Sequence, residues 1–299
     1  MRKKILVIGG TGFIGTSLLK KCKKLNWLLT SVSLHKPLIK DRISGTKYLI
    51  CDISSLKKLK KTIKLNYDYV VNLGGYIDHI NNEKVKKNHL IGPKNLFKIF
   101  KERQIKSFIQ IGSSTEYGRL KSPQKEDSKI CPKDIYGKYK FLATKYYLEC
   151  YKKFDFPVSI IRFYQIYGPH QKKNRFVPQL INACKTGNIF YTSNGTQSRD
   201  FLYIDDAING IIKCIMSPKS KGKIFNIGCG KAMQLKKIMK IVEKKMGNFN
   251  PVFGKISLRK NENRVLYPDI SKARKILKWK NKTTFEKGID KTIKYYKSK

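Results

Sequence analysis

A tyrosine and a lysine four residues apart open a stretch whose pattern predicts a helix running to about residue 154. Tyr136 and Lys140 share one helical face at this spacing. A nearby ammonium group favours the phenolate and lowers the pKa of a tyrosine. Such a phenol is a general acid/base suited to a sugar hydroxyl or a ketone. The alternative is a surface tyrosine beside one of many lysines, and Lys138 and Tyr139 are neighbours of the same types.

Three glycines near the start of the chain follow a short apolar run. Gly9 can take the tight turn that leaves a strand, Gly12 lets a pyrophosphate approach the backbone, and Gly15 lets the following helix pack closely. The first helical residues, Phe13 and Ile14, offer N–H groups and the positive end of the helix dipole to phosphates. The alternative is an ordinary loop. Because a strand precedes the glycines and a helix follows them, we predict a dinucleotide-binding turn.

The end of the second predicted strand, residues 28–34, decides which dinucleotide such a turn accepts. An acidic residue there bonds the ribose hydroxyls of NAD, whereas a basic or small polar site admits the phosphate of NADP. Ser33 occupies this position, followed by His35 and Lys36, and no acidic residue is nearby. We therefore favour NADP over NAD as the cofactor.

Further strand-like runs alternate with helical segments along the first half of the chain. The strands are expected at 48–51, 67–73, 107–111 and 158–164, and the main helices at 84–100 and 136–154. This alternation predicts an α/β fold with a Rossmann-type, doubly wound parallel sheet. Ligands bind at the carboxyl ends of the strands in such sheets.

Two of these strand ends carry candidate cofactor contacts. Asp52 and Ile53 follow the third strand, where a carboxylate can accept a hydrogen bond from an adenine amino group. The equally plausible alternative for Asp52 is the N-cap of a helix that starts near Ser54. Leu73 and Gly74 end the fourth strand, and we expect them close to the cofactor.

The chain is long enough for one large domain or two modest ones, with 299 residues of which 40% are hydrophobic. After residue 168 the segments shorten, with turns at 186–188 and 193–195. We therefore predict a dinucleotide-binding domain over residues 1–168, to which some later segments return. A smaller C-terminal α/β domain over residues 169–299 would bind the substrate.

The formal net charge of +45 comes from 65 basic and 20 acidic residues. The lysines are scattered over every predicted helix instead of forming one stripe, so we interpret them as solvated faces and expect no nucleic-acid partner. The positive field will still attract anionic ligands such as dinucleotides and sugar nucleotides.

Several other classes are excluded by pattern. The seven cysteines contain no Cys-x-x-Cys pair and the four histidines show no ligand spacing, so neither a metal site nor a disulfide framework is expected. No run of eighteen apolar residues predicts a membrane helix. The charged start precedes an apolar run of only four residues, unlike a signal peptide. We expect a cytoplasmic protein without a membrane partner.

Taken in chain order, these motifs resemble the NAD(P)-dependent epimerase/dehydratase family, the extended short-chain dehydrogenase/reductases that act on nucleotide sugars. The resemblance covers nearly the whole chain. It rests on the glycine fingerprint at 9–15, Ser113, Tyr136 with Lys140, the run 162–169, and Arg199-Asp200-Phe201. It implies a nucleotide-diphosphate sugar as the substrate.

The resemblance implies a role for each matching residue in catalysis. Tyr136 would be the acid/base, and Lys140 would lower its pKa and hold the nicotinamide ribose. Ser113 would bond the reacting oxygen of the sugar. Asn88 looks like the helix asparagine that completes the proton relay. Asp52 and Ile53, which follow the third strand, would flank the adenine.

On the substrate side, Arg199 looks like the arginine that grips the diphosphate. Arg259 falls where the family has a second such arginine, and Glu262 falls where a carboxylate touches the nucleotide ribose. Two arginines on one diphosphate fit bidentate charge pairing. The alternative for Arg199 is a surface ion pair with Asp200 or Asp205.

Departures from the family pattern narrow the activity. Sugar 4,6-dehydratases follow the catalytic Ser or Thr with Asp and Glu, which eliminate water. Here Ser114 and Thr115 take those positions and cannot do that work at neutral pH, and Glu116 lies one position too late. We therefore disfavour a dehydratase and keep both hydroxyl residues as substrate contacts. Gln165 stands where relatives usually carry Asn, which changes the expected shape of the substrate pocket.

Two reactions remain open, a 4-ketoreductase and a 4-epimerase, and both need the same Ser/Tyr/Lys set. The missing acid after the second strand favours the reductase. Asn174 and Arg175, in the pattern Asn-Arg-Phe, also look like reductases that make deoxysugars for surface polysaccharide. An alternative from another class is a non-catalytic relative that binds nucleic acid with a steep salt dependence. The intact catalytic set argues against it.

Relatives commonly form homodimers through two helices per subunit, here 84–100 and 136–154, and we expect the same assembly. Apolar outer positions would supply the dimer surface, although such residues are more often core. These positions are Phe97, Phe141, Tyr147 and Cys150.

Overall fold

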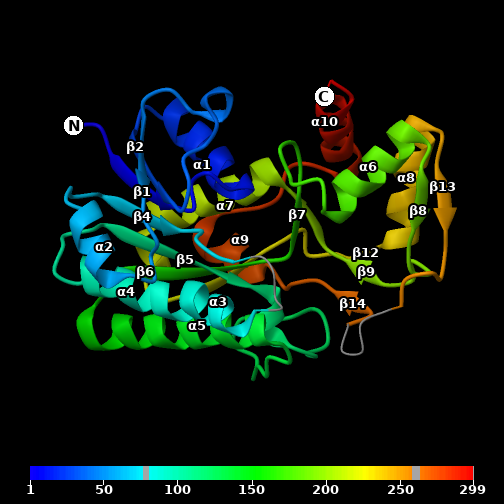
Figure 1. Ribbon diagram of the computed structural model, residues 1–299. Helices are drawn as coiled ribbons and strands as arrows, with labels where there is room; N and C mark the ends of the chain where they lie inside the picture. Colours follow the sequence, from blue (N-terminus) through cyan, green and yellow to red (C-terminus); the bar gives the residue numbers. More distant parts are fainter. Residues whose placement is uncertain (77–80, 258–262, 299) are drawn as a thin grey trace.

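A seven-stranded parallel sheet forms the centre of the computed structural model, which describes residues 1–76, 81–257 and 263–298 (Figure 1). The strand order is β11-β6-β5-β4-β1-β2-β3. The chain adds β2 and β3 on one side of β1 and the later strands on the other side, so the order of strands reverses between β1 and β4. In a doubly wound sheet this reversal opens a crevice at the carboxyl ends of the strands, where ligands bind. The strands are β1 (Lys4–Ile8), β2 (Leu28–Ser33), β3 (Thr46–Ile50), β4 (Tyr69–Asn72), β5 (Ser107–Ser113), β6 (Val158–Phe163) and β11 (Ile224–Ile227).

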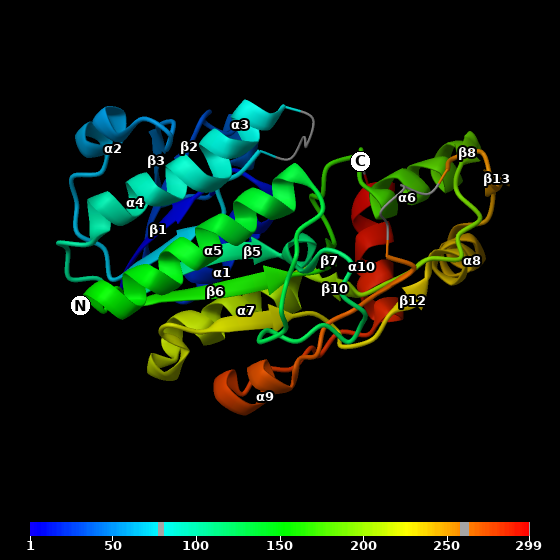
Figure 2. The ribbon, with the colours of Figure 1, turned by 90° about the horizontal axis from the view of Figure 1, so that it is seen from below.

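Helices cover both faces of this sheet, so its strands are apolar on both sides. Along β1, Ile5 and Val7 pack into the core that contains α1 and α7, whereas Leu6 and Ile8 pack into the core beneath α2, α4 and α5. Figure 2 shows α4 and α5 lying side by side on their face. The helices are α1 (Phe13–Lys24), α2 (Leu56–Thr62), α3 (Asn82–Lys86), α4 (Gly92–Phe100), α5 (Ile135–Phe154), α7 (Ile204–Met216) and α9 (Ser271–Leu277).

The helix predicted over 84–100 is present, and its middle part is not a regular α-helix. A π-helical turn, Lys87–Ile91, separates α3 from α4. A π turn holds one more residue than an α turn, and such turns are frequent at functional sites. A sequence pattern of period 3.6 does not reveal the extra residue, so the sequence predicted the helix but not its π turn.

The expected dimer surface on α4 and α5 also needs correction. Phe97, Tyr147 and Cys150 are buried within the protomer. The hydroxyl group of Tyr147 donates a hydrogen bond of 2.7 Å to the carbonyl of Pro93, which ties α5 to α4. Among the four named positions, only Phe141 is partly exposed.

A smaller lobe stands beside the carboxyl ends of the large sheet (Figure 1). Strand β11 and helices α7 and α9 come from the same later half of the chain but pack with the large sheet. The C-terminal helix packs one face against the core through Ile289 and Ile293, which are buried. The helices of the lobe are α6 (Phe176–Thr186), α8 (Leu235–Met246) and α10 (Phe285–Lys297). Two of its small sheets are pairs, β7 (Gln165–Tyr167) with β10 (Phe201–Tyr203) and β8 (Ile189–Tyr191) with β13 (Asn250–Val252). Another has three strands, β9 (Ser198–Arg199) between β12 (Met233–Gln234) and β14 (Val265–Leu266).

Candidate active site

The glycine turn after β1 is built for close approach of backbone segments. Gly9 has a φ of +77°, and a Cβ added to it would lie 3.0 Å from the backbone of Leu73 and Gly74. A Cβ on Gly15 would lie 2.3 Å from the Gly9 carbonyl oxygen. At Gly12 an added Cβ would meet only that carbonyl oxygen, at 3.3 Å, so the turn is open on its outer side. The turn therefore places the ends of β1 and β4 together.

Helix α1 begins at Phe13, directly after this turn. Within the described chain no side chain caps its N-terminus, and no acidic residue lies in its first turn, which includes Ile14. The N–H groups of a first helical turn lack intrahelical partners, and with the helix dipole they attract anions. The start of α1 therefore fits the pyrophosphate of a dinucleotide.

The end of β2 lies against the same turn. The buried Ser33 accepts a hydrogen bond of 3.4 Å from the backbone N–H of Thr11 through its Oγ. His35 and Lys36 follow on the exposed surface. A small hydroxyl residue thus stands at this edge of the turn, with exposed basic groups beyond it.

The structure excludes one of the two interpretations of Asp52, the N-cap of α2. Its Oδ1 accepts a hydrogen bond of 2.8 Å from the N–H of Ser54, whereas the N-cap of α2 is Ser55. Ile53 is buried, and its Cδ1 lies where a Cβ on Gly74 would come within 3.2 Å. Asp52 therefore stabilises the turn after β3 and does not cap the helix.

Ser113, Tyr136 and Lys140 converge at the carboxyl end of β5. The hydroxyl group of Tyr136 is hydrogen-bonded to the side chain of Ser113. The Nζ of Lys140 is buried, donates a hydrogen bond of 2.8 Å to the carbonyl of Ile111, and lies 5.7 Å from the centre of the Tyr136 ring. The Oγ of Ser113 accepts hydrogen bonds from the N–H and the hydroxyl group of Thr115, at 3.2 and 2.9 Å.

Burial has the largest effect on the pKa values of Tyr136 and Lys140. It raises the pKa of Tyr136 to about 12, with a further increase from the charge of Glu116, while the hydrogen bond to Ser113 and the charge of Arg175 lower it. Burial lowers the pKa of Lys140 to about 8, against the opposing charge of Glu116. The sequence predicted a Tyr136 pKa lowered by the lysine, and the structure gives the opposite direction because desolvation outweighs the nearby charges.

Glu116 is fully buried next to Ser113. Its Oε1 accepts a hydrogen bond of 2.8 Å from the N–H of Ser113. Its Oε2 accepts one of 2.9 Å from the hydroxyl group of Thr144 and forms an ion pair of 2.9 Å with Arg162. Since both oxygens bond protein groups, this buried carboxylate is not placed to eliminate water from a sugar. Of the two hydroxyl residues beside it, Ser114 is buried and Thr115 is partly exposed.

The π turn places His89, and not Asn88, against the tyrosine. The rings of His89 and Tyr136 lie 4.8 Å apart, centre to centre, at an angle of 87°. The side-chain amide of Asn88 instead donates a hydrogen bond of 2.9 Å to the carbonyl of Lys84 in its own helix. Spacing could not have revealed His89, because its position depends on the extra residue of the turn.

Arg199 lies on β9 of the smaller lobe and is buried, so the alternative of a surface ion pair does not apply. Its Nη1 donates hydrogen bonds to the carbonyls of Ser198 and Arg264, at 2.8 and 3.3 Å. The carboxylate of Asp200 accepts hydrogen bonds of 2.8 Å from the N–H groups of Cys229 and Gly230.

Three further substrate candidates lie on the segment that leads from β6 to α6. Arg175 occupies the position before the first residue of α6 and is exposed, as is Asn174. The charge of Arg175 lowers the pKa of Tyr136, against the larger opposing effect of burial. Gln165 is exposed at the start of β7. Arg259 and Glu262 lie outside the described residues.

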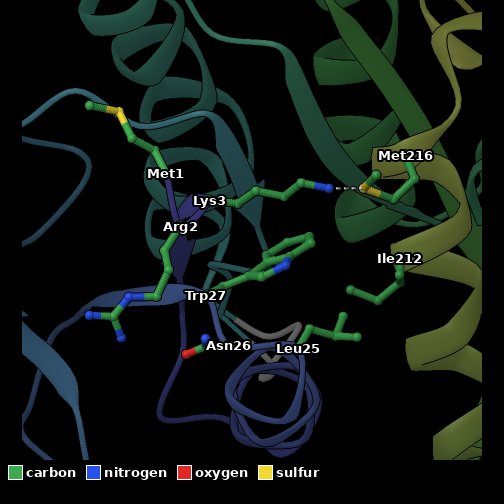
Figure 3. Close-up of a pocket in the computed structure, with 8 residues that line it drawn as sticks. All are labelled: Met1, Arg2, Lys3, Leu25, Asn26, Trp27, Ile212 and Met216. Atoms are coloured by element: carbon green, nitrogen blue, oxygen red, sulfur yellow. Dashed lines mark hydrogen bonds between the residues drawn. The ribbon is translucent and has the colours of Figure 1, made fainter.

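A hollow lies at the opposite end of the sheet, between the first residues of the chain, the segment that follows α1, and α7. Figure 3 shows Lys3 extending past Trp27 toward Met216, with a distance of 3.7 Å from its Nζ to the sulfur. These residues adjoin the amino ends of the strands, away from Ser113 and Tyr136. In the part of the chain that the structure describes, no cluster of His, Cys, Asp or Glu could hold a metal ion, and no helix is long and apolar enough to span a membrane.

A glycine turn between β1 and α1, with a serine, a tyrosine and a lysine at the neighbouring strand end, defines a Rossmann-type enzyme of the dinucleotide-dependent class. The model of the NAD dependent epimerase/dehydratase family matches residues 5–228, and the chain belongs to this family of nucleotide-sugar epimerases, dehydratases and reductases.

Relatives with different reactions are similar over the whole chain. The Bacillus subtilis protein named uncharacterized UDP-glucose epimerase YtcB is 26% identical, with 99% of this chain and 98% of that protein covered. The dTDP-4-dehydro-6-deoxyglucose reductase of Escherichia coli is 25% identical, with the same coverage. The structure of UDP-glucose 4-epimerase from Thermotoga maritima with UDP-glucose has a TM-score of 0.90 at 21% identity and 99% coverage of both chains, which supports the fold.

Proposed function

We propose that the protein is a nucleotide-sugar 4-ketoreductase, acting on a nucleotide-diphosphate 4-keto sugar of the 6-deoxy type. The observation that carries this proposal is the meeting of Ser113, Tyr136 and Lys140 at the end of β5, above a Glu116 that is occupied by protein groups. The same arrangement disfavours a dehydratase. The lack of an acidic residue from Ser33 to Lys36 supports NADPH as the preferred cofactor, with NADH as the alternative.

Each side chain of the set has a defined task in this reaction. The reduced dinucleotide, when bound, supplies the hydride. The Oη of Tyr136 donates a proton to the C4 oxygen, and a pKa of about 12 keeps the phenol protonated at neutral pH, as a proton donor requires. The Oγ of Ser113 orients the C4 oxygen. The ammonium group of Lys140 is fixed by the carbonyl of Ile111 and would hold the nicotinamide ribose.

The other residues form the binding surfaces of the proposal. Arg199 and Arg259 hold the diphosphate, and Glu262 holds the nucleotide ribose. The lobe formed after residue 168 thus binds the substrate. Asn88 stays a predicted relay group. Contacts to the dinucleotide come from Gly9, Gly12, Phe13, Ile14, Gly15, Ser33, His35, Lys36, Asp52, Ile53, Leu73 and Gly74, and contacts to the sugar come from Ser114, Thr115, Gln165, Asn174 and Arg175.

The assembly and setting are also part of the proposal. We infer a homodimer that acts in the cytoplasm, supplying a deoxysugar for surface polysaccharide. Because Phe97 and Tyr147 are internal, the dimer contact on α5 would use partly exposed residues such as Phe141.

A 4-epimerase is the second candidate. The name of the Bacillus subtilis relative and the solved Thermotoga maritima enzyme favour it. An epimerase starts by removing a proton from the C4 hydroxyl group, which requires the phenolate of Tyr136. The raised pKa of that phenol is unfavourable for this first step.

Two assays and one pair of variants test the proposal. NADPH oxidation with dTDP-4-keto-6-deoxyglucose measures the reductase, and conversion of UDP-glucose without added cofactor measures the epimerase. Tyr136→Phe should lower kcat by about 10²-fold or more, as expected for loss of a general acid, and leave dinucleotide binding intact. The matched control is Tyr139→Phe, the same change on the same helix, which should behave as wild type. Full turnover in Tyr136→Phe would refute the proposal.

A further inference from the structure

His89 contacts two parts of the candidate site at once. Its ring packs edge to face with the ring of Tyr136 on α5, at 4.8 Å. Its Nε2 lies 3.1 Å from the backbone nitrogen and 3.0 Å from the carbonyl oxygen of Tyr76, which follows β4. The imidazole is 3% exposed, whereas its partners Tyr76 and Tyr136 are partly exposed.

The loop that His89 contacts runs back to the glycine turn. A Cβ on Gly75 would lie 2.5 Å from the Cε1 of His89, so the absence of a side chain there lets the imidazole lie against the loop backbone. The preceding Gly74 lies 3.0 Å from where a Cβ on Gly9 would stand. One continuous set of contacts therefore joins the glycine turn, the loop 74–76, the imidazole and the tyrosine ring.

The π turn explains why a histidine can occupy this place. Successive residues of an α-helix are rotated by about 100°, so one extra residue changes which side chain faces α5. His89 is turned inward, while Asn88 bonds Lys84 within its own helix. The inward-facing imidazole of His89 therefore offers two groups: its Nε2 bonds the loop, and its flat ring packs against the tyrosine.

We propose that His89 is a positioning residue that fixes the loop 74–76 through its Nε2 and fixes the Tyr136 ring through its imidazole ring. The inference rests on the proposed function, because Gly74 of this loop is assigned to the dinucleotide and the tyrosine to proton transfer. The two contacts use different parts of one side chain. Different substitutions can therefore remove one contact and keep the other.

His89→Phe keeps an aromatic ring beside Tyr136 and removes the nitrogen that bonds Tyr76. We expect the Kd for NADPH, measured by calorimetry, to rise about fivefold, as for one lost hydrogen bond, with kcat within about twofold of wild type. His89→Gln keeps a polar group for Tyr76 and removes the ring. We expect an unchanged Kd and nucleotide-sugar KM, with kcat reduced about fivefold by loss of the aromatic contact.

We therefore expect His89→Phe to change only the Kd and His89→Gln to change only kcat. Lys86→Ala, on the exposed side of α3, is the control and should match wild type. Thermal unfolding is measured for every variant. If both His89 variants lose affinity and kcat together in proportion to a lower Tm, or if both equal wild type, the inference is overturned. A wild-type protein that binds neither NADPH nor NAD would instead contradict the proposed function itself.

Discussion

The side chain of Glu116 has a geometric effect and an electrostatic effect on the site. Its carboxylate bonds the N–H of Ser113 and the side chains of Thr144 and Arg162. Its negative charge raises the pKa values of both Tyr136 and Lys140. An amide in its place would keep an oxygen for the serine N–H and remove the charge. The two effects can therefore be separated experimentally.

Glu116→Gln should shift the alkaline limb of the pH–rate profile to lower pH. In the wild type this limb is expected near the Lys140 pKa of about 8, above which the ammonium group is lost. Without the carboxylate the ammonium group is less favoured, so it deprotonates at lower pH. The same change leaves the buried Arg162 unpaired, and we expect a loss of about 3–5 kcal/mol of stability by denaturant titration.

The matched control for this prediction is Glu149→Gln, at an exposed position of α5. It should change neither the profile nor the stability. If Glu116→Gln lost stability but kept its alkaline limb in place, the charge would have no part in setting the titration. Arg162→Met in the Glu116→Gln background removes the unpaired charge and keeps the profile measurable if the single variant unfolds.

At the scale of elements, helix α5 carries both Tyr136 and Lys140, and its start is fixed by a local contact. The Oδ1 of Asp134, the N-cap residue, accepts a hydrogen bond of 2.7 Å from the N–H of Gly137. Asp134→Ala should therefore reduce stability by about 1 kcal/mol, the usual cost of losing an N-cap, as measured by chemical denaturation.

Asp134→Asn keeps a capping oxygen and should retain wild-type stability. Since the charge of Asp134 contributes to the raised pKa of Tyr136, the amide should also lower that pKa slightly. Equal stability of the alanine variant and wild type would mean that packing alone sets the start of the helix.

Local signals predicted much of the site, because they depend on spacing within one element. The glycine turn and the four-residue spacing of Tyr136 and Lys140 are such signals, and the strands predicted from apolar runs lie within two residues of the observed ends. His89 and Glu116 were missed as parts of the site because their contacts come from other elements. A π turn and a buried ion pair depend on tertiary packing, which no periodicity records.

At the scale of the whole molecule, charge is the feature that packing leaves unbalanced. The chain has 65 basic and 20 acidic side chains, so most of its lysines cannot each have a carboxylate partner. Of the ion pairs among the described residues, the one between Arg162 and Glu116 is buried, whereas Lys87–Glu83 and Lys101–Glu102 are at the surface. The remaining positive charge therefore acts mainly as a field around the protein.

This field should assist the capture of anionic ligands more than their conversion. We expect kcat/KM for the nucleotide sugar to fall several-fold between about 20 mM and 300 mM KCl, with kcat nearly constant, because salt screens the long-range attraction. NADPH carries more negative charge than NADH, so its affinity should fall more steeply over the same range. Stopped-flow binding and steady-state kinetics measure both effects. If the two cofactors showed equal salt dependence, their capture would depend on local contacts and not on the net charge of +45.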